Sequence, residues 1–225
     1  MRRVLVLGRG VDGIRRRIAD TDLVLVEDNP DVVLTRGGDG LLLGSERRWP
    51  GVPKLPLRHS RHGKKCQGHE VSDALERLLA GDLVVTRHDK VQARALGREL
   101  VGLNDVLVHN SSPTSSVRYR VWIDGQQRAR ELVGDGLVVA TPFGSTAYYR
   151  TITRGNFHDG LGLAFNNSIE PVDHMVVPES TEIRVLITRG PALLVADNQT
   201  DDIELNDGDE ILIRKDDSRA IILGL

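Results

Sequence analysis

The sequence predicts an α/β N-terminal domain followed by a mostly-β C-terminal domain. In the first 80 residues, short runs of β-branched residues and leucine alternate with helical patterns, which is typical of a small parallel sheet. After Gly81, strand-length apolar runs follow one another, separated by turn residues, and one helix is expected to begin near Ser145. We therefore expect an α/β domain over residues 1–86 and a β-rich domain over residues 87–225. A return of the C-terminal tail to the first domain is compatible with this division.

The first 80 residues are expected to hold three strands and two helices. The last helix is the clearest, because its apolar residues recur at i, i+3 and i+4, and Gly81 stands where a C′ glycine would end it. The expected strands are Arg3–Leu7, Leu23–Val26 and Asp31–Thr35, and the expected helices are Val11–Ala19 and Glu70–Ala80.

The second domain is expected to be a series of strands. Asp124-Gly125 predicts a type I′ hairpin turn between Arg118–Ile123 and Gln126–Leu132, and Asn206–Asp209 predicts another turn. After Gly81, the expected strands are Leu83–Thr86, which ends at the domain boundary, and then Leu103–Val108, Val117–Ile123, Leu137–Ala140, Ile183–Ile187, Leu193–Ala196 and Ile211–Ile213.

Composition excludes several classes of protein. The chain of 225 residues is 40 % hydrophobic and 28 % charged, which is ordinary for a globular protein. Its net charge of -2 provides no global positive field for nucleic acid or for an anionic membrane. The single cysteine, Cys66, cannot form an internal disulfide, and no apolar run reaches the length of roughly 20 residues that a membrane span needs. We expect a cytoplasmic protein without nucleic-acid or membrane partners.

A first glycine motif, Gly8-x-Gly10-x-x-Gly13, directly follows the first strand. Glu27 follows the next strand at about the spacing of an acid that binds a ribose diol, so the pattern matches a dinucleotide fingerprint. The alternative is a simple glycine-rich turn between strand and helix. The helix that follows ends before Thr21, which is short for a dinucleotide fold and favours the turn.

A second glycine motif, Gly37-Gly38-Asp39-Gly40, follows the third expected strand. Without Cβ atoms, backbone N–H groups can approach phosphate oxygens, and the carboxylate of Asp39 could take a proton from a hydroxyl or organise Mg²⁺. The alternative is a tight turn with Asp39 as a helix N-cap, although a cap needs no glycine pair. The absence of a G-x-x-x-x-G-K-[ST] pattern excludes a P-loop NTPase.

Two further polar motifs lie in the second domain. Asn104 and Asp105 open an apolar strand, where they either reach one ligand across a backbone turn or form a plain Asx turn. Residues 134–148 predict a strand that ends at Thr141-Pro142, followed by a helix with Ser145 as N-cap. Free N–H groups at that helix start suit an anion or a sugar-phosphate, with Tyr148 nearby; the alternative is a turn and cap without function.

In this order, the motifs resemble those of the NAD kinase family over about residues 31–150. The block Gly144-Ser145-Thr146-Ala147-Tyr148 is specific to that family, whereas Gly-Gly-Asp-Gly is shared with diacylglycerol, sphingosine and phosphofructokinase-like kinases. The resemblance implies transfer of a phosphoryl group from ATP or polyphosphate to the adenosine-ribose 2′-hydroxyl of NAD(H), with Mg²⁺ as cofactor. It also implies a site in the cleft between an α/β and a β-rich domain, and a homodimer or homotetramer.

The resemblance also implies a role for each matching residue. Asp39 would activate the 2′-hydroxyl, and Asp135 would meet the nicotinamide end of the dinucleotide. The remaining residues form three groups: Gly37, Gly38 and Gly40 face phosphates, Asn104 and Asp105 bind hydroxyl and base groups, and Ser145, Thr146, Ala147 and Tyr148 line the substrate pocket.

The chain departs from the family pattern at Leu41, Asp105 and Phe143, where the family mostly has threonine, glutamate and a small hydroxyl residue. The N-terminal domain is abbreviated. Two alternatives therefore stay open: a kinase for another small hydroxyl acceptor, such as a sugar or nucleoside, and a non-catalytic sensor that binds NAD(P).

A segment unlike the family, Leu55–His69, invites three interpretations. It is a basic surface loop, a zinc site of His59, His62, Cys66 and His69, or a donor-phosphate contact made by Arg58, Arg61, Lys64 and Lys65. A single cysteine favours the loop over a structural zinc site.

Overall fold

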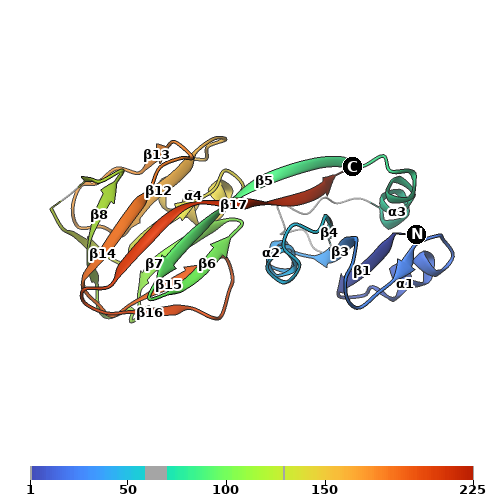
Figure 1. Ribbon diagram of the computed structural model, residues 1–225, viewed down its shortest axis with the longest axis horizontal. Coiled ribbons are helices and arrows are strands. Elements are labelled where there is room, and N and C mark those ends of the chain that lie inside the picture. Colours follow the sequence, from blue (N-terminus) through green and yellow to red (C-terminus); the bar gives the residue numbers. More distant parts are fainter. Residues whose placement is uncertain (1, 59–69, 129, 225) are drawn as a thin grey trace. The chain divides into compact units, whose positions relative to one another are not determined.

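The computed structural model describes residues 2–58, 70–128 and 130–224. The chain forms two compact units, one of residues 1–88 together with 219–225 and one of residues 89–218. Two long strands, β5 (Val84–Ala95) and β17 (Glu210–Gly224), pair with each other and contribute to both units (Figure 1). The first unit is α/β and the second is rich in strands, which confirms the predicted fold class.

The first unit holds a parallel sheet in the order β4-β3-β1-β2, with the end of β17 beside β4. Its elements are β1 (Arg3–Gly8), α1 (Asp12–Ala19), β2 (Val24–Leu25), β3 (Val32–Gly37), α2 (Asp39–Arg48), β4 (Lys54–Arg58) and α3 (Val71–Ala80). Helices α1 and α3 bury apolar residues against one face of the sheet, while α2 packs on β3 and β4. Gly81 ends α3 with φ 73°, as predicted for a C′ glycine.

Helix α2 and strand β4 are absent from the sequence prediction. Lys54 and Pro56 interrupt the apolar run of β4, and proline lowers the expectation of a strand. Both neighbours of β4 nevertheless pair with it in parallel, and Leu55 and Leu57 are buried. The interpretation of Leu55–His69 as a basic surface loop is therefore wrong for its first residues, while residues 59–69 lie outside the described residues.

A buried ion pair joins α2 to β4. The Lys54 ammonium group is fully buried, pairs with the carboxylate of Glu46 and donates to the carbonyl of Trp49. The second carboxylate oxygen of Glu46 accepts the Gly51 N–H at 3.1 Å. Lys54 also lies opposite Val33 of β3 and Ile222 of β17, so the charge is located where three strands meet.

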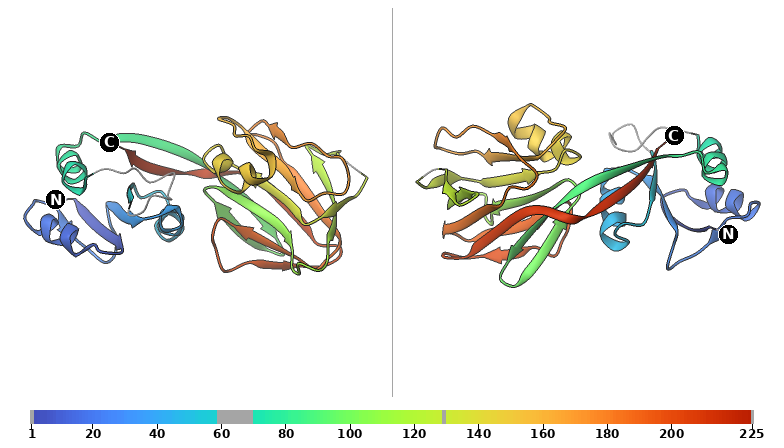
Figure 2. Two further views of the ribbon diagram at one scale, coloured as in Figure 1. Left: turned by 180° about the vertical axis from the view of Figure 1, so that it is seen from behind. Right: turned by 45° about the horizontal axis from the view of Figure 1, so that its top comes forward.

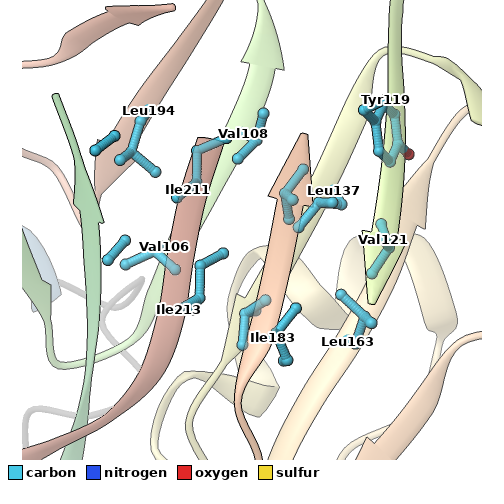
Figure 3. Packing of buried hydrophobic residues seen from close by; sticks show 14 of the residues in the cluster. Val106, Val108, Tyr119, Val121, Leu137, Leu163, Ile183, Leu194, Ile211 and Ile213 are labelled. Carbon is cyan, nitrogen blue, oxygen red and sulfur yellow. The ribbon is translucent and has the colours of Figure 1, made fainter. Parts of the chain in front are cut away.

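The second unit is built of two antiparallel sheets packed face to face (Figure 2). One contains β10-β8-β14-β17 with the β5–β6 hairpin, and the other has the order β13-β12-β11-β7-β15-β16. Figure 3 shows Val106, Leu137 and Leu163 of one sheet packed with residues such as Ile183 and Ile213 of the other. The strands are β6 (Arg98–Gly102), β7 (Asp105–Asn110), β8 (Val117–Ile123), β9 (Gln126–Gln127), β10 (Leu132–Gly134), β11 (Gly136–Ala140), β12 (Leu161–Asn166), β13 (Met175–Val177), β14 (Ile183–Arg189), β15 (Ala192–Ala196) and β16 (Ile203–Leu205).

Both predicted turns of this unit are present. Asp124 and Gly125 have φ 48° and 77°, as a type I′ turn requires, but the strand after them is only β9, shorter than the expected Gln126–Leu132. At the other turn, the Asn206 N–H donates to the Asp209 carboxylate at 2.7 Å. Among the described residues, no helix combines the length and apolar character needed to cross a membrane.

We predict that Glu46→Gln lowers the free energy of unfolding by about 3–5 kcal/mol, because it leaves the buried Lys54 charge without its counter-charge. Denaturant unfolding measures this effect. The matched control is Glu99→Gln, which removes a solvent-exposed partner of Arg94 and should change stability by less than about 1 kcal/mol. Equal effects of the two variants would contradict a special role for the buried pair.

Candidate active site

The Gly-Gly-Asp-Gly motif forms the junction between β3 and α2. Gly37 is the last residue of β3, Gly38 is the N-cap, and Asp39 is the first residue of α2. Only Gly38 therefore separates the strand from the helix. The alternative of Asp39 as N-cap is therefore wrong. A Cβ at Gly38 would meet no heavy atom within 4 Å, and its φ of -108° suits any residue. The fold itself does not require glycine at position 38, and the backbone there is open to a ligand.

The Gly8-x-Gly10-x-x-Gly13 motif has a different explanation. At Gly8, with φ 124°, a Cβ would lie 2.1 Å from the Arg36 carbonyl oxygen, so only glycine allows β1 to approach β3 there. At Gly13, in contrast, space is open, and α1 is only eight residues long. Glu27 is exposed and lies 3.9 Å from Arg15. These features support the glycine-rich turn over the dinucleotide fingerprint.

Asn104 lies in a backbone bend that directly precedes β7, and Asp105 is the first residue of that strand. Both side chains are largely buried, with 8 % and 7 % of their surface exposed. The bend at residues 103–104 ends where β7 begins at Asp105, which lies opposite Ala140 of β11. Because the chain bends there, the two neighbours are not bound to the alternating directions of a regular strand.

Asp197, which belongs to none of the expected motifs, stabilises this bend. Its carboxylate accepts the backbone N–H groups of Leu103, Asn104 and Asp105 at 2.8, 2.7 and 3.2 Å. Its own N–H donates to the Asp105 carbonyl at 3.0 Å, and its φ is 50°. The signal in the sequence is Asp197-Asn198 directly after an apolar strand, since these residue types tolerate the left-handed region.

Thr141 and Gly144 hold the same bend from the other side. The Thr141 N–H donates to the Asn104 carbonyl at 2.8 Å, and its hydroxyl donates to the Leu103 carbonyl at 2.7 Å. A Cβ at Gly144 would lie 1.9 Å from the Asn104 carbonyl oxygen. This close approach explains the glycine of the Gly144–Tyr148 block, because any side chain would separate the two segments.

Ser145 is not a helix N-cap. It lies in a 3₁₀ turn, Gly144–Thr146, and the helix α4 (Tyr148–Thr153) begins after Ala147. The Ser145 hydroxyl is buried and lies 2.8 and 3.1 Å from the carbonyl oxygens of Pro142 and Phe157, which share its single proton. It fastens the turn instead of accepting an N–H. Thr146 and Ala147 are half-buried beside it.

The Tyr148 hydroxyl lies close enough to the carboxylates of Asp135 and Asp105 for their negative charges to affect its pKa. Burial raises the pKa of the Tyr148 hydroxyl, and the charges of Asp135 and Asp105 raise this pKa further. Asn166, at the end of β12, donates to the Tyr148 hydroxyl oxygen at 3.0 Å. Asn167 donates to the Asp135 carboxylate at 3.2 Å. The tyrosine stays protonated near neutral pH and has its proton available for an acceptor.

The structure thus divides the predicted site residues into two groups. The glycine turn and Asp39 belong to the first unit, and all the others belong to the second. Asn166 and Asn167 are not among the predicted site residues, because the sequence pattern does not predict β12. In the described part of the chain, no three His, Cys, Asp or Glu side chains could together hold a metal ion. The proposed zinc ligands, His59, His62, Cys66 and His69, lie outside that part, as do Arg61, Lys64, Lys65 and the side chain of Arg58.

Comparison with known proteins places the chain in a family. Residues 103–223 match the ATP-NAD kinase C-terminal domain. An NAD kinase of Magnetococcus marinus is 33 % identical over 210 residues, covering 85 % of this chain and 68 % of that protein. An NAD kinase of Acidithiobacillus ferrooxidans is also 33 % identical, over 205 residues, covering 82 % and 67 %.

Two solved structures share the fold. The crystal structure of an NAD kinase from Archaeoglobus fulgidus in complex with ATP aligns with a TM-score of 0.82 at 21 % identity, covering 99 % of this chain and 93 % of that one. Yeast NADH kinase complexed with NADH aligns with a TM-score of 0.81 at 17 % identity, covering 100 % and 84 %. The resemblance drawn from the sequence motifs is thereby confirmed: this chain is a kinase that belongs to the NAD kinase family.

Proposed function

We propose that the protein transfers a phosphoryl group from ATP or inorganic polyphosphate to the adenosine-ribose 2′-hydroxyl of NAD(H). The observation that carries this proposal is the polar cluster of Asn104, Asp105, Asp135 and Tyr148 within the matched family domain. Relatives that bind ATP and NADH support both ligand classes.

Asp39 is the proposed general base. It follows Gly38, where open space around the backbone leaves room for a phosphate or hydroxyl group. Its position, after the carboxyl end of a parallel strand, is where ligands bind in open α/β sheets. A carboxylate there would accept the proton of the attacking hydroxyl as the new P–O bond forms and the P–O bond to the leaving group, ADP or the shortened polyphosphate, breaks.

Asn104 and Asp105 are the proposed contacts to the acceptor. The amide and carboxylate would bind ribose hydroxyl or base N–H groups, and an analogue that lacks those donors would lose these hydrogen bonds to a buried, charged acceptor. The protonated Tyr148 hydroxyl would donate a hydrogen bond to the phosphoryl-acceptor substrate. Asp135 would meet the nicotinamide end, with Thr146 and Ala147 lining the pocket.

The proposed Mg²⁺ fits a site at which the protein provides few ligands and the substrate phosphates provide the others. Magnesium is commonly held by one or two carboxylates together with substrate phosphates, and Asp39 is a carboxylate placed for this. When bound, the ion would neutralise charge on the phosphates.

The alternatives predict different outcomes in one assay. A kinase for another hydroxyl would phosphorylate a sugar or nucleoside in preference to NAD, whereas a sensor would bind NAD(P) without turnover. The presence of Asp39 favours an enzyme, because binding alone needs no base. The neighbouring Gly38, which the fold does not require, leaves its backbone open to a ligand. Purified protein with ATP or polyphosphate, Mg²⁺ and a panel of NAD, NADH, nucleosides and sugars tests all three.

Replacement of Asp39 by asparagine should lower kcat by roughly 10²–10⁴-fold, because the proton acceptor is lost while the shape of the side chain is kept. Steady-state kinetics and NAD calorimetry measure the two effects separately. Asp12→Asn is the matched control, since Asp12 is also the first residue of a helix that follows a strand, and its kcat should stay near the parent value. Parent-like turnover of Asp39→Asn would remove Asp39 from the mechanism.

Asp105→Ala should cost about 2–4 kcal/mol in kcat/KM for NAD, because the lost bonds involve a charged acceptor. Tyr148→Phe should cost less and should act mainly through KM. Since the raised pKa keeps Tyr148 protonated, the effect of Tyr148→Phe should be constant between about pH 6 and 9. If Asp105→Ala and Tyr148→Phe bind NAD as the parent does, the acceptor pocket lies elsewhere.

A further inference from the structure

A pocket of about 230 Å³ lies at the amino edge of the parallel sheet, where β1, β3 and β4 begin. It is lined by Arg2, Asp31 and Pro53, which directly precede these three strands. All of its lining residues belong to the first unit. The turn of Gly38 and Asp39 follows the carboxyl end of β3, at the opposite edge of the sheet. The pocket therefore has no part in the function proposed above.

Most of the pocket lining is apolar. Leu78 of α3 and Leu223 of β17 line the pocket and belong to the buried core of the first unit. Leu83 is partly buried, and Val85 keeps 50 % of its surface exposed, so the apolar lining extends from the core to the surface. An apolar cavity of about 150 Å³ holds one benzene molecule. The larger pocket here therefore suits an apolar group of about six to nine carbon atoms.

A guanidinium group accompanies this apolar lining. Arg2 is exposed, and its Nη1 donates to the carbonyl of Leu78, in the last turn of α3, at 2.7 Å. This hydrogen bond fixes the side chain beside the pocket. Arg2 Nε and Nη2 have no partner among the residues that the structure describes. This edge of a guanidinium group can bind a carboxylate with two parallel hydrogen bonds.

The other charged residue of the lining, Asp31, is paired with a neighbour outside the pocket. Its carboxylate accepts the Arg3 guanidinium at 3.0 Å and the Arg3 backbone N–H at 2.7 Å. The hydrogen bond from the guanidinium, followed by that from the N–H, lowers the pKa of the Asp31 carboxyl below its ordinary value, so Asp31 stays ionised and paired at neutral pH. Arg2 thus carries the uncompensated charge of the pocket, which favours a ligand with a single negative charge.

We propose that this pocket binds a small amphipathic monocarboxylate, with its carboxylate on Arg2 and its apolar chain against Leu78, Leu83, Val85 and Leu223. Burial of the chain provides most of the affinity, and the charged contact fixes the orientation of the ligand. One guanidinium group balances one negative charge, so a monocarboxylate fits better than a phosphate dianion. The proposal is independent of the proposed function, because this ligand is neither the phosphoryl donor nor NAD(H).

Calorimetric titration of the whole chain with octanoate, hexanoate and 1-octanol tests both parts of the ligand. Hexanoate should bind roughly tenfold more weakly than octanoate, because it buries two methylene groups fewer. 1-Octanol, which lacks the charge, should bind about three- to tenfold more weakly than octanoate. In Arg2→Gln this preference for octanoate should disappear. Arg77→Gln is the matched control: it removes the same charge from the last turn of α3, outside the pocket, and should keep the preference.

Two neighbouring positions of β5 test the location of the ligand. Val85→Phe places a larger side chain in the pocket and should raise the Kd for octanoate roughly tenfold or more, because it occupies the space of the apolar chain. Val84→Phe is the matched control, since Val84 is 59 % exposed but does not line the pocket, and its Kd should change less than about twofold. Both positions are exposed, so we expect both variants to fold.

Two results would overturn the inference: no binding of octanoate to the parent protein, or binding that Arg2→Gln and Val85→Phe leave at the parent strength. Sedimentation detects a competing occupant. If octanoate does not bind and Val85→Phe lowers the oligomeric state, a second copy of the chain covers the pocket instead. None of these measurements needs turnover, so a failure to phosphorylate NAD would refute the proposed function and leave this inference standing.

Discussion

The backbone of residues 103–105 is hydrogen-bonded on two sides, and these hydrogen bonds position the polar cluster of the second unit. Asp197 accepts three consecutive N–H groups on one side, while Thr141 bonds two carbonyls on the other. Gly144 permits the contact, because any Cβ would displace the Asn104 carbonyl. The bend therefore presents Asn104 and Asp105 with its backbone groups already paired, and a ligand need not order them. Such preorganisation lowers the entropic cost of binding.

The glycines of this chain fall into two classes that the sequence cannot separate. Gly8 and Gly144 are required by the fold, since a Cβ would meet a neighbouring carbonyl oxygen at 2.1 or 1.9 Å. Gly38 has open space around it and an ordinary φ, so its glycine is better explained by a ligand that approaches the backbone. This contrast separates the Gly-Gly-Asp-Gly motif from the Gly8–Gly13 motif, although both follow parallel strands and contain three glycines.

The two units offer different chemistry to their ligands. The sheet edge of the first unit combines the open backbone at Gly38 with the carboxylate of Asp39, which suits a phosphate group and an attacking hydroxyl. The cluster of the second unit combines the carboxylates of Asp105 and Asp135 with amides and a protonated tyrosine, which suits hydroxyl and N–H donors. A reaction between a phosphate donor and a sugar hydroxyl needs both kinds of surface.

The sequence by itself determined the two-part architecture, the hairpin turn at Asp124-Gly125 and the motifs that carry the family resemblance, because these rest on local periodicity and turn chemistry. Tertiary structure decided the rest. Strand β4 forms despite Pro56 and a buried Lys54, since Glu46 supplies a counter-charge from a helix that local patterns did not predict. Ser145 fastens a turn instead of capping a helix, because the carbonyl of Phe157 lies within reach of its hydroxyl. Asp197 lies 92 residues after Asp105 in the sequence, and the pairing of β15 with β7 brings the two residues together.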